Sequence, residues 1–159
     1  MQVFVPSTDM RESVRVLDTL RLRKQLLECV GILSILHNLP KADGSPRKGH
    51  LNHPAVLQWK YWPGCLATYA RMCIDELESR GIVYEGQRER VESFESDDNK
   101  PIWWGDERVH STHRSRLLQK DPVHYGQFNW EEASMEPQSY WWAIPLNESE
   151  YNLERRGKS

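Results

Sequence analysis

Four polar side chains recur along the first third of the chain at a spacing that gathers them on one face of a helix. They are Asp18, Arg21, Gln25 and Glu28, separated by three, four and three residues. Side chains at such spacings lie above one another on an α-helix. The same line continues to apolar residues, Ile32 and Ile35, so Glu28 stands where a polar stripe meets an apolar one.

This position would affect the chemistry of Glu28. Burial raises the pKa of a carboxylate, and a neighbouring arginine lowers it. A carboxylate balanced in this way can serve as a general acid or base, which makes Glu28 a candidate catalytic residue. The pattern is equally compatible with a partly buried Glu28 that pairs with Arg21 or another base for structural reasons alone.

Histidines and basic residues form a second group further along the chain. The group comprises His110, His113, Arg114, Arg116 and Lys120, and His124, Tyr125 and Gly126 follow it. A His-x-x-His pair can bind zinc, but no third ligand accompanies it at a suitable spacing, so the sequence predicts no metal site. Basic side chains interleaved with aromatic ones favour a nucleic acid, whose phosphates attract charge and whose bases stack on rings.

The charge is unevenly distributed, although the formal net charge is only -2. Residues 11–60 carry nine Lys or Arg against four acids, and residues 100–120 carry five against two. Residues 75–98 and 121–159 are acidic. If the two basic segments fold together, they make one positive face suited to phosphates. The alternative is that these clusters are ordinary solvated helix faces.

Length and composition narrow the class of protein. A chain of 159 residues with 38% hydrophobic and 28% charged residues fits one soluble globular domain. No apolar run reaches the length of a membrane span, and no basic segment followed by an apolar one begins the chain, so a cytoplasmic location is expected. Three cysteines without Cys-x-x-Cys spacing should be buried, reduced thiols. No P-loop, Rossmann, Gly-x-Ser-x-Gly or His-Glu-x-x-His motif is present.

The periodicity of apolar residues predicts a mainly α fold, a compact single-domain helical bundle with long, irregular, aromatic-rich loops and C-terminal segment. The first helix should span about residues 11–37, and residues 38–51 should form an exposed loop. A second helix should start at 52–54, break at Pro63 and stop at Gly81.

The second half of the chain is patterned less strongly. Residues 82–98 are predicted to be a surface loop, and the basic segment that follows Asp106 is predicted to be a helix that stops before Pro122. The aromatic, proline-punctuated end should wrap the core as irregular structure. Most tryptophans and their aromatic neighbours should be core or lid residues: Trp59, Tyr61, Trp62, Trp103, Trp104, Trp141 and Trp142.

Several segments, in their order, resemble the pyrimidine-dimer DNA glycosylase family. RLRKQLLECVGIL resembles the family's catalytic-glutamate helix, with Glu28 at the glutamate position. NHPAVLQW and LATYARMCIDELESRG are similar to its central helix, including His53, and THRSRLLQKDPVHYGQF is similar to its C-terminal region. The resemblance covers about residues 1–128 and is closest to a poorly characterised bacterial and phage branch.

The resemblance implies an enzyme that binds duplex DNA, bends it and flips a nucleotide out of the stack. The family's nucleophile is the N-terminal amine, which attacks C1′ of the deoxyribose and allows β-elimination after the base leaves. An α-amine has an ordinary pKa of about 7.7 to 8.0, so a usable fraction is unprotonated near neutrality. Gln2 is too large for efficient removal of the initiator methionine, so the amine here would belong to Met1. Neither a metal nor an organic cofactor is implied.

The sequence therefore predicts a DNA glycosylase, with or without AP-lyase activity, with Met1 and Glu28 as catalytic residues. The predicted DNA-binding residues are Arg21, Lys24, Gln25, Asn52, His53, His113, Arg114, Arg116, Lys120 and Tyr125. Residues 1–128 would form the glycosylase-like domain of a monomer, and 129–159 an aromatic and acidic extension packed on it. Two alternatives remain open: a non-catalytic module that senses modified DNA, and an enzyme that acts on a free nucleotide or nucleoside.

Overall fold

The computed structural model describes residues 1–156, and helices dominate it, which confirms the predicted mainly α class. The helices are α1 (Met10–Arg15), α2 (Thr19–Leu36), α3 (Pro54–Leu57), α4 (Pro63–Ser79), α5 (Glu85–Glu92), α6 (Glu107–Lys120) and α7 (Pro122–Gly126), followed by a short 3₁₀ helix η1 (Glu131–Ser134). A two-stranded sheet of β1 (Trp142–Pro145) and β2 (Tyr151–Glu154) ends the described chain. Residues 157–159 of the predicted C-terminal extension lie outside the described residues.

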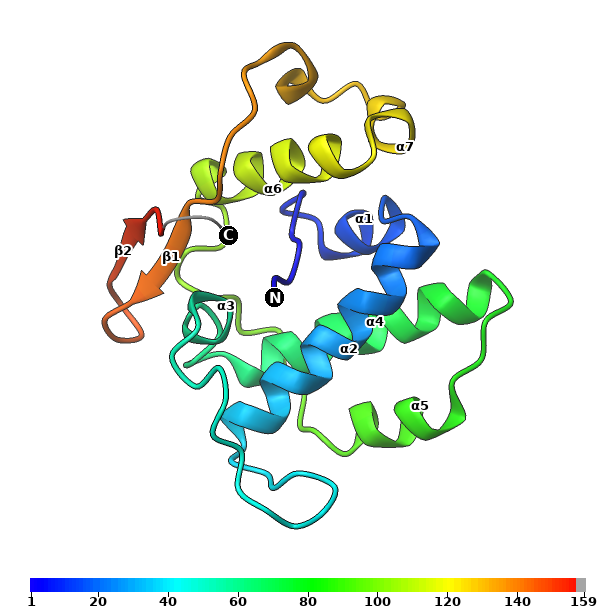
Figure 1. The fold of residues 1–159 in the computed structure, drawn as a ribbon, viewed down its shortest axis with the longest axis vertical. Coiled ribbons are helices and arrows are strands. Elements are labelled where there is room, and N and C mark those ends of the chain that lie inside the picture. Colours follow the sequence, from blue (N-terminus) through cyan, green and yellow to red (C-terminus); the bar gives the residue numbers. More distant parts are fainter. Residues whose placement is uncertain (157–159) are drawn as a thin grey trace.

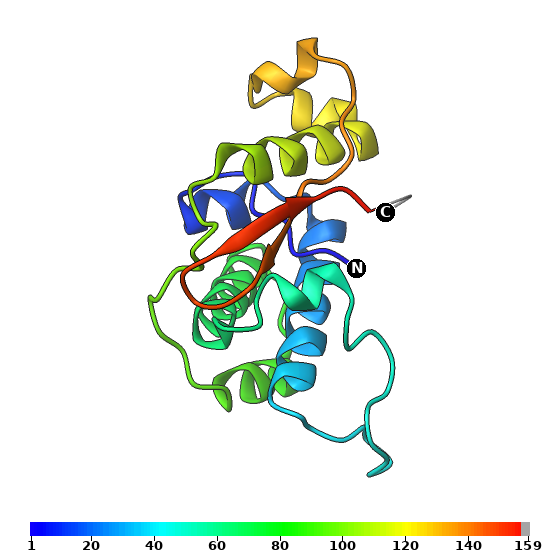
Figure 2. The same ribbon diagram turned by 90° about the vertical axis from the view of Figure 1, so that its left-hand side faces the viewer.

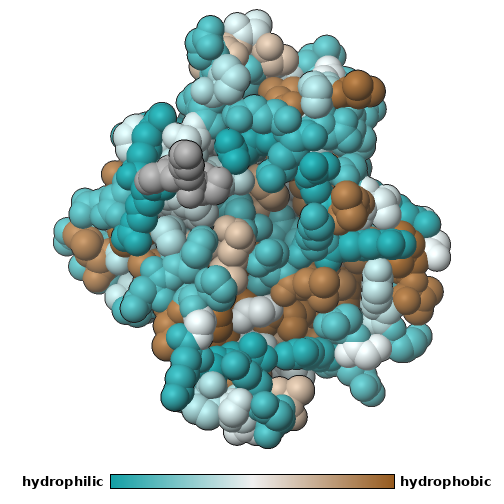
Figure 3. All heavy atoms as spheres, viewed as in Figure 1, coloured by the Kyte–Doolittle hydropathy of each residue, from teal (hydrophilic) through white to brown (hydrophobic). Residues whose placement is uncertain are grey.

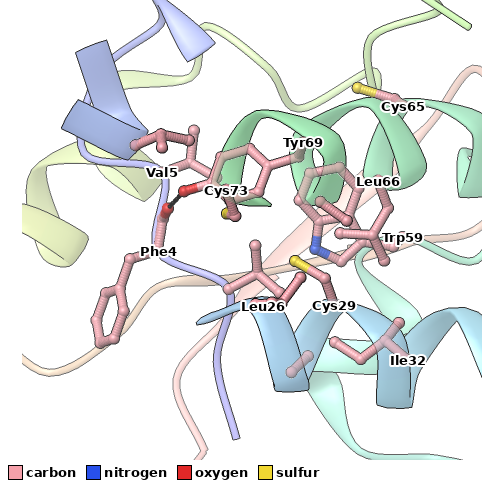
Figure 4. Close-up of a cluster of buried hydrophobic side chains, with 14 of the residues drawn as sticks. Phe4, Val5, Leu26, Cys29, Ile32, Trp59, Cys65, Leu66, Tyr69 and Cys73 are labelled. Carbon is pink, nitrogen blue, oxygen red and sulfur yellow. Dashed lines mark hydrogen bonds between the residues drawn. The ribbon is translucent and has the colours of Figure 1, made fainter. Parts of the chain in front are cut away.

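The core lies between the two longest helices, α2 and α4 (Figure 1). Figure 4 shows Leu26 and Cys29 of α2 facing Leu66, Tyr69 and Cys73 of α4. All five side chains are almost completely buried. The three cysteines of the chain are buried and free, as the sequence predicts.

The predicted first helix is two helices, which corrects the expected continuous span 11–37. α1 ends at Arg15 and α2 begins at Thr19, and Asp18 between them has an extended backbone. Its carboxylate accepts a hydrogen bond from the N–H of Arg21 and so caps α2. Aspartate favours this position because its side chain satisfies a backbone donor that the first turn leaves unpaired.

The helix signals around α3 and α4 are confirmed. His53 caps α3, with Pro54 at its first position, and a second helix begins at Pro63 after a break. α4 runs to Ser79, and Gly81 then takes a backbone φ of 82°. Glycine adopts this left-handed conformation without strain, so it terminates the helix.

The prediction of a loop over residues 82–98 is wrong in its middle, where α5 forms. The helix is mostly polar, so its hydrophobic periodicity is weak, but Val91 and the nearby Phe94 are buried. Arg88 forms salt bridges with Asp75 and Glu78 of α4, both at 2.8 Å. The tertiary contact with α4 thus supports a helix that the local pattern does not reveal.

The C-terminal part is more regular than expected. α6 ends at Lys120, before Pro122 as predicted, but the segment beyond it contains α7, η1 and the β1–β2 hairpin instead of irregular structure alone. The strands pair antiparallel, with Trp142 opposite Glu154 and Pro145 opposite Tyr151. The hairpin lies beside α3, which β1 contacts (Figure 1 and Figure 2). No helix within residues 1–156 is long and apolar enough to span a membrane.

Candidate active site

A cavity of about 310 Å³ opens where the N-terminus, α2, α6 and the C-terminal segment meet. The ribbon views place the N-terminus on the face shown in Figure 3, which is largely hydrophilic. Eight residues singled out from the sequence line the cavity: Met1, Arg21, Lys24, Gln25, Glu28, His53, Arg116 and Lys120. Four further lining residues were not predicted: Gln2, Phe4, Tyr140 and Trp142. The volume suits a small ligand such as one nucleotide unit.

Helix α2 supplies one wall of the cavity. Arg21, Lys24, Gln25 and Glu28 fall at three- and four-residue intervals, so one helix face presents all four. Arg21 donates to the carboxylate of Asp18 at 3.2 Å. Burial opposes ionisation of Asp18, but hydrogen bonds from Tyr125 and Arg21 outweigh it and lower the pKa of the carboxyl. Asp18 therefore holds Arg21 in the wall and does not itself line the cavity.

The N-terminal segment is fixed to α2 by the side-chain amide of Gln25. Its oxygen accepts from the N–H of Phe4 at 2.7 Å, and its nitrogen donates to the carbonyl of Gln2 at 3.2 Å. Gln25 is fully buried, so neither bond competes with solvent. The Gln25 side chain thus pairs two backbone groups that a neighbouring strand would pair in a sheet. Glu28, one turn further along α2, is held in fixed relation to the first residues of the chain.

Helix α6 fixes the same segment from the other side. The N–H of Val5 donates to Nδ1 of His113 at 2.8 Å, and Nδ1 of His110 lies 2.7 Å from the carbonyl of Val5. Because Nε2 of His110 accepts from Gly105, the proton of this imidazole is on Nδ1. Tyr69 of α4 also donates to the carbonyl of Phe4 (Figure 4). Side chains of three helices thus set the path that brings Met1 to the cavity.

His53 lies near the N-terminal amine. Its Nδ1 accepts from the N–H of Ala55 at 3.0 Å, which caps α3. Partial burial lowers the pKa of His53, and the positive charge of the N-terminal amine lowers it further. A neutral imidazole whose Nδ1 accepts carries its proton on Nε2, so His53 offers one N–H donor.

Four cations gather at one end of the cavity, two from α2 and two from α6. They are Arg21, Lys24, Arg116 and Lys120. Partial burial lowers the pKa of Lys120, and the charges of Arg116, Arg21 and Lys24 lower it further. Like charges repel unless an anion lies among them, so this end of the cavity is suited to a phosphate.

An aromatic surface closes the cavity on the side of the C-terminal segment. The ring centroids of Tyr140 and Trp142 lie 5.0 Å apart, and that of Phe4 lies 6.2 Å from that of Tyr140. His53 meets Trp142 edge-on, with ring centroids 5.8 Å apart. The alternation in the run SYWWAIP could have indicated that residues 140 and 142 share a face of an extended segment. The sequence alone could not indicate which face meets the cavity.

Besides Gln25, whose amide is bonded to the N-terminal backbone, three residues predicted to bind DNA are engaged inside the protein, which corrects their expected position. His113 is 0% exposed, and burial lowers its pKa to about 3. Arg114 forms two hydrogen bonds with the buried carboxylate of Glu132, at 2.8 and 2.9 Å. Tyr125 is buried and donates to Asp18. A phosphate would have to displace these contacts to reach any of the three.

Asn52 is exposed beside His53 but does not line the cavity. Within residues 1–156, no three His, Cys, Asp or Glu side chains gather into a group that could hold a metal ion. The tryptophans expected in the core are largely there, since Trp59, Trp62 and Trp103 are buried.

The family model for pyrimidine dimer DNA glycosylase matches residues 1–90. The match includes Met1, all of α2 and His53, and it covers more than half of the 159 residues. Helix α6 and the C-terminal hairpin lie beyond it. Neither a curated protein nor a solved structure matches the chain.

Proposed function

The chain belongs to the pyrimidine dimer DNA glycosylase family, and we propose that it removes a damaged or modified base from duplex DNA using the amine of Met1 and the carboxylate of Glu28. The observation that carries the proposal is that Met1 and Glu28 line one cavity. Met1 is 40% exposed, so its end of the segment is open to a ligand. The buried bonds to residues 2–5 hold the amine at this position.

The proposed chemistry starts with the lone pair of the unprotonated Met1 amine. The amine attacks C1′ of the deoxyribose, a C–N bond forms, and the glycosidic bond breaks with its electron pair on the departing base. The base takes up a proton, and the amine nitrogen loses one. The C1′–O4′ bond then breaks, O4′ takes up the second amine proton, and C1′ and the nitrogen form an imine. Removal of a C2′ proton forms a C2′=C3′ double bond and expels the 3′ phosphate with the electrons of the C3′–O bond. Glu28 is the group in the cavity suited to accept and return these protons.

The four cations of the cavity are proposed to bind the DNA backbone at the extruded nucleotide. Phosphate contacts position a duplex without reading its sequence. A nucleotide must leave the stack for C1′ to enter the cavity that Met1 lines, and this costs least where pairing is already damaged. Arg21, Lys24, Arg116 and Lys120 would offset part of that cost by holding the flanking phosphates.

A borohydride trap tests the proposal directly. Reduction of the imine should link the protein covalently to duplexes that carry ultraviolet photoproducts, modified bases or a natural abasic site. Acetylation of the N-terminus should abolish the adduct, because the amide nitrogen has no available lone pair. If no duplex in such a panel is trapped or nicked, the proposed amine chemistry is wrong.

Glu28→Gln tests the carboxylate. The exchange keeps the shape of the side chain and removes its charge and its proton affinity. Turnover should fall by a factor of about 10² to 10⁴, while binding and the unfolding transition should change little. Glu148→Gln, on an exposed turn of the hairpin, is a matched control that should leave turnover unchanged. Equal activity of Glu28→Gln and wild type would remove Glu28 from the mechanism.

Two other uses of the cavity are separated by the same assays. Tight, salt-sensitive binding to modified duplexes with no trapped or nicked product would indicate a DNA-sensing module. Release of a base from a mononucleotide, with no reaction on duplexes, would indicate an enzyme acting on free nucleotides. In both alternatives, the four cations and the aromatic side of the cavity would still bind the ligand.

A further inference from the structure

The C-terminal segment is bound in place as part of the cavity. In residues 138–143, the N–H of Gln138 donates to Ser115 at 2.8 Å and the N–H of Trp141 donates to Thr112 at 3.2 Å. The N–H of Ala143 donates to the side chain of Gln58 at 2.9 Å, in the link between α3 and α4. These anchors come from side chains, so the segment has a defined register on α6 although it pairs there with no strand.

The register decides which rings face the cavity. Successive side chains of an extended segment point to opposite sides. Tyr140 and Trp142 line the cavity, whereas Trp141 between them lies under the guanidinium of Arg155, 4.4 Å from the ring centroid. We call Tyr140 and Trp142 the aromatic wall. Both are at least 95% buried, so their orientation is fixed by packing.

The cavity has two chemically different ends. The cations of α2 and α6 gather at one end, where the guanidinium of Arg116 lies over the ring of Tyr140, 5.3 Å from its centroid. At the other end His53, near the Met1 amine, packs against Trp142. Arg21 and Glu28 are seven residues apart on α2, which corresponds to about 10 Å along the axis. The cation end suits a phosphate, and the other end is lined by the ring of Trp142 with one N–H donor beside it. This combination matches a nucleotide whose base is directed away from its phosphate.

We propose that the aromatic wall and His53 form the subsite that recognises the extruded base, so that the C-terminal segment determines which base is accepted. The base would pack on Trp142 and Tyr140, and Nε2–H of His53 would donate to the carbonyl oxygen beside the glycosidic nitrogen, which is O2 of a pyrimidine. The inference rests on the proposed function. It adds a role for residues 138–143, which lie beyond the family match.

Base recognition can be measured separately from chemistry. Two duplexes are compared that differ at one position, which holds either an unpaired thymidine or a tetrahydrofuran residue without a base. Wild type should bind the thymidine duplex about tenfold more tightly, the value expected for one stacked base. Trp142→Leu should lose most of that ratio and keep its affinity for the tetrahydrofuran duplex. Tyr140→Leu should also lose most of the ratio, but it removes the ring under Arg116 and should weaken binding of both duplexes. Trp141→Leu, with the same exchange on the opposite face, should keep the ratio.

His53→Ser tests the donor without removing the cap. Serine is a favoured N-cap residue, so α3 should remain intact, but its side chain has no second polar atom directed at the base. Wild type should prefer thymidine over 2-thiothymidine, whose sulfur is a weaker acceptor than O2, by roughly fivefold. His53→Ser should show no such preference. If circular dichroism shows that Trp142→Leu does not fold, His53→Ser and Tyr140→Leu still test whether these residues recognise the base.

The outcomes separate this inference from the proposed function. Equal affinity of wild type for the thymidine and tetrahydrofuran duplexes overturns the base subsite, even if borohydride traps the protein on a natural abasic site. An unchanged ratio in the Trp142 and Tyr140 variants overturns the role of the aromatic wall. Base discrimination that depends on these residues, without any trapped adduct, would support the subsite and overturn the amine chemistry alone.

Discussion

The side-chain oxygen of Gln25 accepts the N–H of Phe4 at 2.7 Å and thereby fixes the start of the chain to the helix that carries Glu28. The amide nitrogen of Gln25 completes the link through the carbonyl of Gln2. A terminus is ordinarily the most mobile part of a domain unless it is tied down. Here a buried amide makes two bonds to backbone groups that have no strand partner, so the geometry of the site depends on a residue without a chemical role.

Replacing Gln25 with leucine should therefore affect both stability and activity. The exchange leaves two buried backbone groups unpaired, and each costs about 1–3 kcal/mol. Urea unfolding should show a loss of roughly 2–6 kcal/mol, and trapping should fall more than DNA affinity because the amine loses its fixed position. Gln127→Leu, an exposed glutamine in the same chain, should change neither. Wild-type stability in Gln25→Leu would show that water or neighbouring groups replace these bonds.

The position of the Met1 amine can be tested by extending the chain. A short Gly-Ser extension before Met1 removes the α-amine from the cavity while leaving every bond of residues 2–5 in place. Borohydride trapping should be lost, and the unfolding midpoint should stay within experimental error. The same residues added after Ser159 are the control and should leave trapping intact. Trapping by the extended protein at the wild-type rate would point to another nucleophile.

Burial of His113 makes the fold sensitive to mild acid. Its pKa is lowered from an ordinary value of 6.5 to about 3, because its environment disfavours the charged form. A base with a lowered folded pKa binds its proton more readily in the unfolded chain, so unfolding takes up protons. Stability is therefore unaffected above pH 6.5 and falls as the pH drops from about 6.5 toward 3. The slope should approach 1.4 kcal/mol per pH unit.

The test is a series of denaturant curves between pH 7 and pH 4.5. His113→Asn is the informative variant, because its side-chain oxygen can accept the N–H of Val5 and does not titrate. Its stability should depend less on pH than that of wild type. The pKa of His110 is also lowered by burial, so part of the slope should remain. Identical slopes for wild type and His113→Asn would show that His113 is not protonated on unfolding in this range.

Sequence patterns predicted the elements that local rules determine. α4 follows from apolar periodicity with Pro63 and Gly81 at its ends, and most of α2 follows from the same periodicity. α6 was predicted from the basic segment that stops before Pro122. α5 was missed because it is stabilised by tertiary contacts, through the buried Val91 and the salt bridges of Arg88 with α4. The hairpin was missed because its anchors, Thr112 and Gln58, are distant in sequence.

The candidate site was predicted best where its residues share one element. Spacing alone placed Arg21, Gln25 and Glu28 on one face of α2, and all three line the cavity. The fourth residue of the predicted line, Asp18, caps α2 and does not line the cavity. In α6, spacing could not distinguish the face that meets the cavity from the face that packs inward. Arg116 and Lys120 line the cavity, while His113 and Arg114 hold the N-terminal segment and Glu132. Which face of α6 meets the cavity depends on the segments that pack against the helix. The local sequence pattern does not contain this information.

This division of α6 predicts different salt dependences for two of its basic residues. Each phosphate contact adds about 0.9 to the slope of log affinity against log salt concentration. Lys120→Ala should lower the magnitude of the slope by about that amount for both specific and nonspecific duplexes. Arg114→Ala should leave the slope unchanged and instead destabilise the fold by about 3–5 kcal/mol, because Glu132 remains buried without its partner. Arg15→Ala, an exposed arginine of α1, is the control for both measurements. If Arg114→Ala lowers the slope as Lys120→Ala does and leaves the unfolding free energy unchanged, Arg114 binds DNA, and its ion pair with Glu132 opens when the duplex is bound.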